Sequence, residues 1–247
     1  MSSGSRAALC KCLGPSLAST ALNRFKSFRP RTSFSSASTR LFRMATDPPP
    51  QPPSASGSGE ASSAPASSAI DFLSLCHRLK TTKRAGWMRK DIQSPESIAD
   101  HMYRTGLMAL IASDIPGVDR DKCIKMAIVH DIAEAIVGDI TPSDGVPKHE
   151  KSRLEQEALD YMCKLLGGGE RAKEIGQLWM EYEENLSLEA KFVKDLDKVE
   201  MILQALEYET EQGKNLEEFF QSTAGKFQTE VGKAWASEIV SRRKTKR

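Results

Sequence analysis

Apolar residues recur at helical spacing along most of the chain from Ile70 onward. Phe72, Leu75 and Leu79 open this pattern, since positions three and four apart fall on one face of an α-helix. No stretch of the sequence clearly alternates between apolar and polar residues, which is the pattern of a half-buried β-strand. The pattern predicts an all-α fold, a single helical bundle over residues 69–240 that follows a disordered N-terminal extension.

Polar residues that favour helix N-termini stand directly before three of the predicted helices. Ser97, Asp119 and Ser187 are each placed so that the side chain can accept a hydrogen bond from the first turn of a helix. Three consecutive glycines, 167–169, are expected to end the helix that precedes them. Four further helices are predicted. One follows the turn at 141–145, one spans about 170–184, one begins near Asn215, and one spans 228–241.

The N-terminal region has a different composition from the rest of the chain. Residues 1–46 are rich in Ser and contain eight Lys and Arg residues but no Asp or Glu, which is typical of an organelle transit peptide. We therefore expect a chloroplast or mitochondrial protein, with a basic disordered arm as the alternative. Met44 could start a shorter, cytosolic form. Residues 47–68 are dominated by Pro, Ser, Gly and Ala and are expected to form a disordered linker.

Charge and hydropathy exclude some classes of partner. The basic N-terminal region leaves 27 basic and 33 acidic residues in the rest of the chain, a net charge of −6. This balance gives no reason to expect nucleic acid as a partner. No apolar run approaches the length that is needed to span a bilayer, so no membrane is expected.

The dipeptide His130-Asp131 stands in an apolar setting, next to Val129 and Ile132. Because a buried carboxylate is costly unless it is paired or bound to a cation, this pair is a candidate metal site. Imidazole and carboxylate donors suit a first-row divalent ion or Mg²⁺. Glu134 follows His130 by four residues, on the same face of the predicted helix, and could act on metal-bound water without being a ligand. A core histidine beside a surface acid is the alternative.

Two further residues have side chains that carry metal-binding groups in apolar surroundings. His101 lies near a predicted helix start, ahead of an apolar face. Asp197 has Val193 and Met201 four residues before and after it, so its face of the helix is expected to point inward. Asp195 lies on the opposite side, nearer to two lysines, and is expected to be solvated. Of the two acids, Asp197 is the better candidate ligand.

The order of His101, His130-Asp131 and Asp197 resembles the H…HD…D signature of the HD superfamily of metal-dependent phosphohydrolases. Further motifs are similar to those of the HD-domain 5'-deoxynucleotidases and cover residues 70–230. These motifs are Leu79 to Trp87, Pro95 to His101, His130 to Ile140, Phe192 to Asp197 and Ser222 to Phe227. In bacterial relatives the Arg and Trp of the first motif are adjacent, whereas two residues separate Arg84 from Trp87 here.

This resemblance implies an HD phosphohydrolase domain that hydrolyses (deoxy)nucleoside 5'-monophosphates to a nucleoside and phosphate. It implies one divalent metal ion, Co, Mn, Mg or Zn, and a homodimer. The implied metal ligands are His101, His130, Asp131 and Asp197.

The resemblance also implies roles for four other residues. Glu134 would orient or deprotonate a water, or protonate the leaving ribose oxygen, and Asp139 would act at the substrate. Arg84 would bind the phosphate, because a planar guanidinium matches its geometry. Trp87 would form a wall of the sugar pocket and exclude a 2'-hydroxyl.

Three alternatives stay open at the level of the sequence. The domain could act on nucleoside triphosphates, cyclic nucleotides or guanosine tetraphosphate, or on another small phosphorylated metabolite of an organelle. It could also be a non-catalytic HD scaffold, although the complete set of ligands together with Glu134 argues against that. The chain contains no Gly-rich phosphate loop, no Cys-x-x-Cys site and no Ser nucleophile motif, which argues against kinase, zinc-finger and serine-hydrolase functions.

Overall fold

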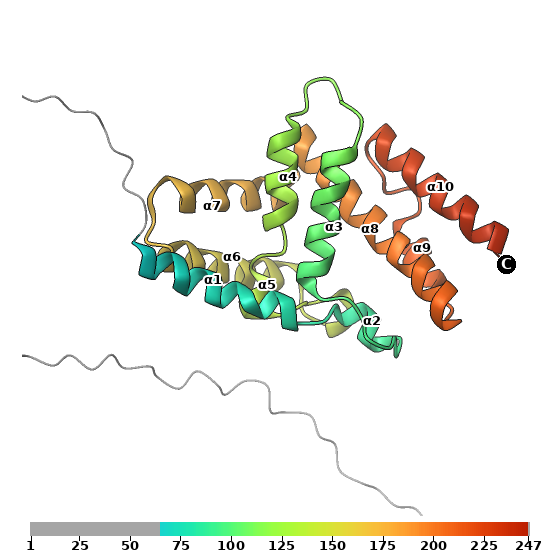
Figure 1. The fold of residues 1–247 in the computed structure, drawn as a ribbon, viewed down its shortest axis with the longest axis horizontal. Helices are drawn as coiled ribbons and strands as arrows, with labels where there is room; N and C mark the ends of the chain where they lie inside the picture. The colour runs from blue at the N-terminus through green and yellow to red at the C-terminus, as the bar shows by residue number, and fades with distance from the viewer. Residues whose placement is uncertain (1–64, 247) are drawn as a thin grey trace, which may run out of the picture. The chain divides into compact units, whose positions relative to one another are not determined.

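The computed structural model describes residues 65–246, and this part of the chain is helical throughout (Figure 1). The predicted all-α fold is confirmed. Within these residues, β-pairing is confined to one antiparallel bridge between Lys83 and Ser97. The helices are α1 (Ala66–Thr81), α2 (Ala85–Arg89), α3 (Ile98–Ile111), α4 (Arg120–Val129), α5 (Glu134–Val137), the 3-10 helix η1 (Pro142–Asp144), α6 (Lys148–Leu165), α7 (Gly169–Glu184), α8 (Leu188–Gln212), α9 (Glu217–Thr223) and α10 (Glu230–Lys246).

The predicted targeting segment, residues 1–46, lies outside the described residues, as does the predicted linker from residue 47 to residue 64. Residues 66–68, which the composition assigned to the linker, form the start of α1. No helix in the described part of the chain combines the length and apolar character that crossing a bilayer requires.

All three predicted N-caps are present. Ser97 accepts a hydrogen bond from the backbone of Asp100, whose side chain accepts one from the backbone of Ser97 in return. Asp119 caps α4 and Ser187 caps α8 in the same way, through hydrogen bonds to residues three positions on. These caps satisfy backbone N–H groups that have no partner inside the helix.

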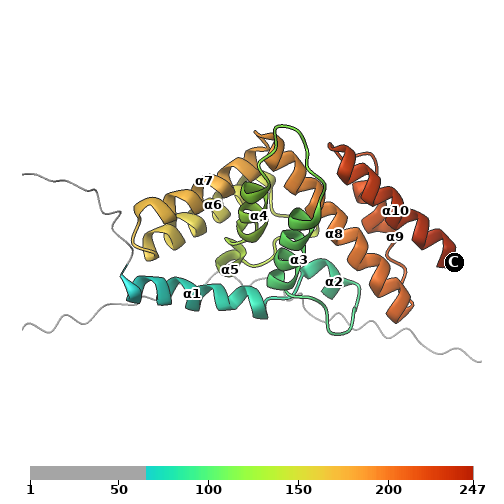
Figure 2. The same ribbon diagram turned by 45° about the horizontal axis from the view of Figure 1, so that its top comes forward.

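Helices α3, α4 and α8 pack against one another at the centre of the domain (Figures 1 and 2). On one side, α4 also contacts α7, which lies along α6, and α1 contacts α3, α5 and α6. On the other side, α10 packs along α8. This arrangement brings together residues that are far apart in the sequence on α3, α4 and α8.

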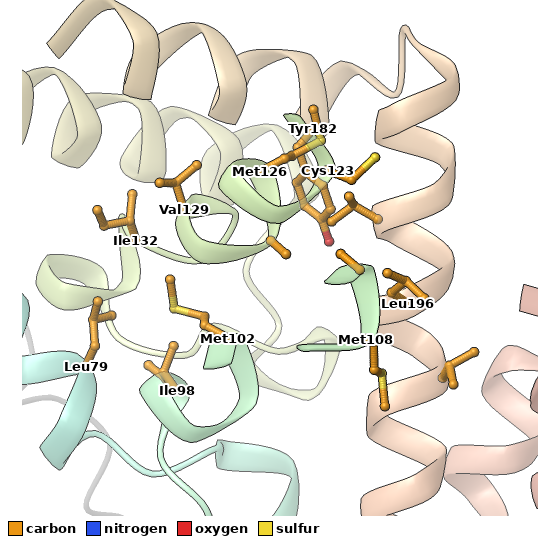
Figure 3. Close-up of a cluster of buried hydrophobic side chains, with 14 of the residues drawn as sticks. Leu79, Ile98, Met102, Met108, Cys123, Met126, Val129, Ile132, Tyr182 and Leu196 are labelled. Carbon is orange, nitrogen blue, oxygen red and sulfur yellow. The ribbon is translucent and has the colours of Figure 1, made fainter. Parts of the chain in front are cut away.

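The hydrophobic core lies between these helices (Figure 3). All ten α-helices of residues 65–246 contribute side chains to it, and among these side chains are Leu79, Ile98, Met102, Met126, Tyr182 and Leu196. Each of these six is at most 6% exposed. Burial of one such large side chain contributes about 1.5–3 kcal/mol, so the framework that positions the site is well stabilised.

The expected continuous helix through His130 and Glu134 is wrong. Helix α4 ends at Val129, and residues 130–133 form tight turns before α5 begins. The backbone N–H groups of Ile132 and Glu134 donate to carbonyls three residues earlier, at 3.1 and 3.0 Å. Because such turns are tighter than an α-helix, they direct the His130, Asp131 and Glu134 side chains in ways that regular helical spacing does not predict.

The expectation that Asp195 is solvated is also wrong, because its side chain is fully buried. Its carboxylate accepts hydrogen bonds from the backbone N–H groups of Gln228 and Thr229, at 2.8 and 2.6 Å, and from the Thr229 hydroxyl at 2.9 Å. These donors lie at the start of α10, which covers this side of α8. Asp195 therefore holds α10 against α8.

Candidate metal centre

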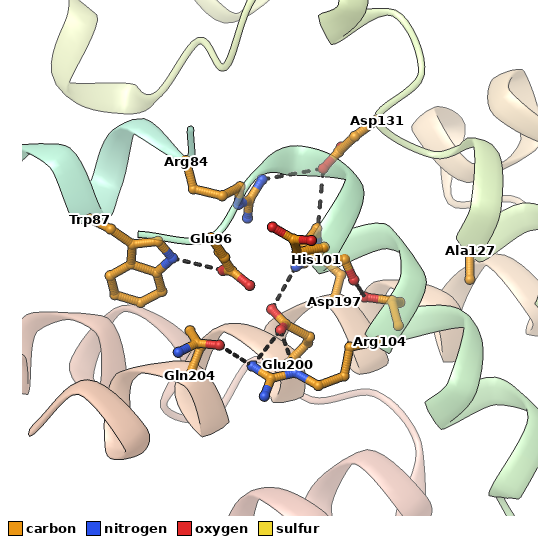
Figure 4. A network of polar contacts seen from close by, with 12 residues as sticks. Arg84, Trp87, Glu96, His101, Arg104, Ala127, Asp131, Asp197, Glu200 and Gln204 are labelled. Carbon is orange, nitrogen blue, oxygen red and sulfur yellow. Dashed lines mark hydrogen bonds and ion pairs between the residues drawn. The ribbon is translucent and has the colours of Figure 1, made fainter. Parts of the chain in front are cut away.

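Three elements deliver the candidate ligands to one point (Figure 4). His101 comes from the first turns of α3, His130 and Asp131 from the turn after α4, and Asp197 from α8. Nε2 of His101 lies 3.3 Å from Nε2 of His130 and 3.2 Å from Oδ1 of Asp197. Oδ2 of Asp131 lies 3.3 Å from Nε2 of His130 and 3.7 Å from Nε2 of His101. The structure thus brings together all four residues that the sequence singled out as ligands.

The other ring nitrogen of each histidine has a protein partner. Nδ1 of His101 lies 2.6 Å from Oε2 of Glu200, and Nδ1 of His130 lies 2.8 Å from the carbonyl oxygen of Ala127. Because a carboxylate and a carbonyl are acceptors, a neutral ring carries its proton on Nδ1 in both cases. In that tautomer the Nε2 atoms of both rings, 3.3 Å apart, are free to coordinate one cation.

The distances fit a single divalent ion. Ligand atoms about 2.0–2.2 Å from one metal lie about 3–3.5 Å apart, which is close to the spacings seen here. The donor set of two imidazole nitrogens and two carboxylate oxygens suits first-row divalent metals. His101, His130 and Asp131 together form a cluster whose ligand atoms all lie within 4.8 Å of one another. The residues present therefore fit a bound metal.

The two aspartates keep a negative charge at this point. Burial alone would raise the pKa of Asp131, but His130 and Arg84 hold it well below its usual range. Burial acts in the same way on Asp197, whose pKa is held low by the His101 side chain. Asp197 also accepts a hydrogen bond from the hydroxyl of Tyr182, at 3.0 Å. Both carboxylates are thus ionised, as metal ligands must be.

Glu200 is a site residue that the sequence analysis missed. It is fully buried, and besides His101 it contacts Arg104, whose Nε and Nη2 lie 2.7 and 2.6 Å from its Oε1 (Figure 4). A carboxylate behind a histidine ligand fixes the orientation of the ring and its tautomer. The signal was available in the sequence, because Glu200 is a charge one turn after the apolar Leu196 and next to Val199.

Glu134 lies beside the cluster and is 3% exposed. Within residues 65–246 its Oε2 has no hydrogen-bond partner. Burial, and after it the negative charges of Asp131 and Asp139, raise the pKa of Glu134 well above its usual range. This shift favours the protonated form of the carboxyl, and one of its oxygens is free for a ligand.

Arg84 and Asp139 are linked to the cluster through the start of α2. The backbone N–H of Arg84 donates to the Glu96 carbonyl at 3.1 Å, as part of the antiparallel bridge between Lys83 and Ser97. Oδ2 of Asp139 accepts from the N–H of Ala85 at 2.6 Å. These bonds hold Arg84 so that its Nη1 lies 3.2 Å from Oδ2 of Asp131 (Figure 4).

A cavity of about 660 Å³ opens beside the cluster. Asp131 and Asp197 line it together with other acidic residues and with basic side chains that include Arg84, Lys151 and Lys194. Neither lysine is among the residues that the sequence predicts to bind a ligand. The volume is in the range of pockets for small molecules.

Trp87 also borders this cavity, but its side chain is only 2% exposed. Its Nε1 donates to Oε1 of Glu96 at 2.7 Å (Figure 4). Its ring packs edge-on against Tyr208 and lies against Phe219, with centroid distances of 5.4 and 4.4 Å. The ring is therefore mostly covered by protein.

The sequence resembles known proteins over most of the described part. The HD domain family matches residues 76–239. The human protein 5'-deoxynucleotidase HDDC2 is 47% identical over 182 residues, which cover 73% of this chain and 88% of that protein. The Schizosaccharomyces pombe protein 5'-deoxynucleotidase hdd1 is 45% identical over 182 residues, 71% of this chain and 90% of that protein.

Solved structures show the same fold. The PH0347 protein of Pyrococcus horikoshii is 35% identical, with a TM-score of 0.58 over 70% of this chain and 97% of that chain. The HD domain-containing protein YGK1 is 32% identical, with a TM-score of 0.54 over 72% of this chain and 86% of that chain. The arrangement of two histidines and two aspartates therefore occurs in a chain that belongs to the HD domain family.

Proposed function

We propose that the protein is a metal-dependent 5'-deoxynucleotidase, which hydrolyses deoxynucleoside 5'-monophosphates to nucleoside and phosphate. The observation that carries the proposal is a cluster of two histidines and two aspartates beside a cavity that is lined by both acidic and basic side chains, Arg84 and Lys194 among the latter. Relatives at 44–52% identity are named 5'-deoxynucleotidases, and they match most of the described residues. A phosphate monoester is the kind of ligand that this combination of charges accommodates.

His101, His130, Asp131 and Asp197 would hold one divalent ion, Co, Mn, Mg or Zn. When bound, such an ion lowers the pKa of a coordinated water and neutralises charge on a phosphate. The orientation of the two histidines would be maintained by Glu200 and by the Ala127 carbonyl, which occupy their Nδ1 atoms.

Arg84 and Lys194 would bind the phosphate group. The Arg84 guanidinium uses one of its donors on Asp131 and has others that can meet phosphate oxygens. The Lys194 ammonium lies 3.9 Å from the centre of the Tyr182 ring and forms no ion pair with a carboxylate in the described residues. Its charge is therefore available to a ligand in the cavity.

Glu134 would donate the proton that the leaving 5'-oxygen needs. As water oxygen bonds to phosphorus and the bond from phosphorus to the 5'-oxygen breaks, that oxygen gains negative charge and takes the proton of Glu134, and a proton lost by the water would restore the acid for the next turnover. The raised pKa of Glu134 keeps its proton in place for this step. Asp139 would position Arg84 and α2 through its bond to the Ala85 N–H.

The edge of Trp87 that borders the cavity would lie at the sugar end and exclude a 2'-hydroxyl there, while the rest of the ring is covered by protein. Replacement of Trp87 by Ala should then raise the activity on ribonucleotides relative to deoxyribonucleotides, because a site that rejects by bulk loses its rejection when the bulk is removed.

The test is phosphate release by the full chain from a panel of dNMPs, NMPs, dNTPs and simple sugar phosphates, with and without added Co²⁺, Mn²⁺, Mg²⁺ or Zn²⁺. The proposal predicts metal-dependent release from dNMPs, with slower release from NMPs and none from dNTPs. Release from triphosphates or sugar phosphates alone would overturn the assignment of the substrate. No release from any substrate with any metal would overturn the assignment as an enzyme.

A further inference from the structure

The cavity has an apolar side that the chemistry of phosphate release does not use. Met201 lies on α8 four residues after Asp197, about 6 Å further along the helix axis. It borders the cavity together with Phe219 of α9, Gly86 and the edge of Trp87. The wall therefore changes from charged to apolar within one helical turn of the metal cluster.

Phe219, rather than Trp87, presents an aromatic ring to this side of the cavity. Trp87 is enclosed by Tyr208, Phe219 and its hydrogen bond to Glu96, whereas Phe219 is half-buried and borders the cavity. The Phe219 ring is thus supported by Trp87, at 4.4 Å between centroids and a tilt of 35°.

The residues around Phe219 leave room for its ring and hold α9 in position. A Cβ atom on Gly86 would lie only 3.2 Å from Cε1 of Phe219, so the absence of a side chain at Gly86 leaves room for the ring. Two contacts hold the first half of α9 in place. Lys90 pairs with Glu218 at 2.7 Å, and the buried Phe220 ring packs against the Arg243 guanidinium at 3.9 Å.

We propose that Phe219 is the surface on which the nucleobase of the substrate packs, and that Trp87 acts as a positioning residue behind it. This inference rests on the proposed function, and it assigns the nucleoside to the apolar side when the phosphate lies at the metal cluster. Every base has a π-face, so packing on Phe219 binds all four bases. Glu218, next to Phe219 in the chain, is paired with Lys90, so neither of these charges is free to read a base edge.

The test compares Phe219→Ala and Phe219→Leu with the unchanged chain. Tyr103→Leu serves as the control, because Tyr103 is 69% exposed on α3 and does not border the cavity. The measurements are the KM for dAMP and the inhibition constants of deoxyadenosine and inorganic phosphate. Loss of one base–aromatic contact should raise the KM for dAMP and the inhibition constant of deoxyadenosine about 5- to 150-fold in Phe219→Ala. Phe219→Leu should give a smaller increase, since it keeps apolar area.

Inorganic phosphate should inhibit all variants with constants within about twofold, because the charged side of the cavity is unchanged. Equal weakening of phosphate and deoxyadenosine would contradict the proposal, since it would indicate general damage to the site. Unchanged binding of deoxyadenosine in both Phe219 variants would also overturn it. If the unchanged chain hydrolyses no dNMP, the proposed function fails, and equilibrium dialysis of deoxyadenosine against the same variants decides the subsite separately.

Discussion

At the scale of single residues, each candidate ligand has a partner that fixes it before any ion binds. Glu200 and the Ala127 carbonyl hold the two histidines, and Tyr182 donates to Asp197. Such partners reduce the reorganisation that a site must undergo when it binds a metal. Glu134 and Arg84, which lie beside the ligands, can therefore be replaced one at a time, and we expect different effects on catalysis and on phosphate binding.

Glu134→Gln tests proton donation. It keeps the size of the side chain but removes the acid, so we expect kcat for dAMP to fall about 10²- to 10⁴-fold, with metal content and KM nearly unchanged. Because the pKa of Glu134 is raised, its protonated form dominates at low pH, and kcat of the unchanged chain should decrease as pH rises through this pKa. The variant should lack this decrease. Glu157→Gln, at an exposed position on α6, is the control, and equal kcat values in both variants would rule out the role of Glu134.

Arg84→Ala tests phosphate binding. Removal of a charge-assisted contact costs about 1.5–3 kcal/mol, so the KM for dAMP should rise about 10- to 150-fold. Arg84→Lys should recover only part of this, because an ammonium keeps the charge but cannot form the two parallel bonds of a guanidinium. Steady-state kinetics with dAMP would measure the KM of both variants. An unchanged KM in Arg84→Ala would mean that the guanidinium serves only to pair with Asp131.

Polar residues in apolar patterns indicated candidate ligands, and the resemblance to the HD superfamily implied that four of them form one set. His101, Asp131 and Asp197 were each singled out in this way, and the structure brings them together with His130. The course of the backbone at His130 was not predictable, because nothing in the local sequence forbids continuation of α4. The covered position of Trp87 was also not predictable, since it depends on Tyr208 and on Phe219.

At the scale of helices, α8 is buried on two sides. One side carries the site residues Asp197 and Glu200, and another carries Asp195 beneath α10. The apolar pattern of one helix, taken alone, reveals a single buried face. For this reason the prediction that Asp195 is solvated was wrong. Its partners are 33 and 34 residues further along the chain, which places this contact beyond any local signal.

Asp195→Ala should destabilise the domain. It leaves two backbone N–H groups at the start of α10 without their acceptor, which costs about 2–5 kcal/mol in the free energy of unfolding. Urea denaturation followed by circular dichroism would measure this. Glu230→Gln, which disturbs only the exposed pair with Lys233 in the first turn of α10, should cost under about 1 kcal/mol. Equal stability of the two variants would show that the buried carboxylate does not hold α10.

At the scale of the whole molecule, every described side chain that borders the cavity lies between Arg84 and Ser222. A chain that begins at Pro65 keeps all of α1, including the buried Phe72 and Leu79. We therefore expect its turnover of dAMP to match that of the full chain. A chain that begins at Thr82 lacks α1 and should unfold at lower temperature. A large loss of turnover in the first chain, with its helical content retained, would show that residues 1–64 complete the site.

The central claim is that four residues hold one metal ion that the reaction requires. It is tested most directly by measuring the metal content and the dAMP turnover of His130→Ala and Asp131→Ala in the same samples as the unchanged chain. The account predicts about one metal ion per unchanged chain, loss of both the metal and the activity in each variant, and retained helical circular dichroism, because ligands to one ion act as a unit. Activity equal to that of the unchanged chain in either variant, with the metal content also unchanged, would contradict it.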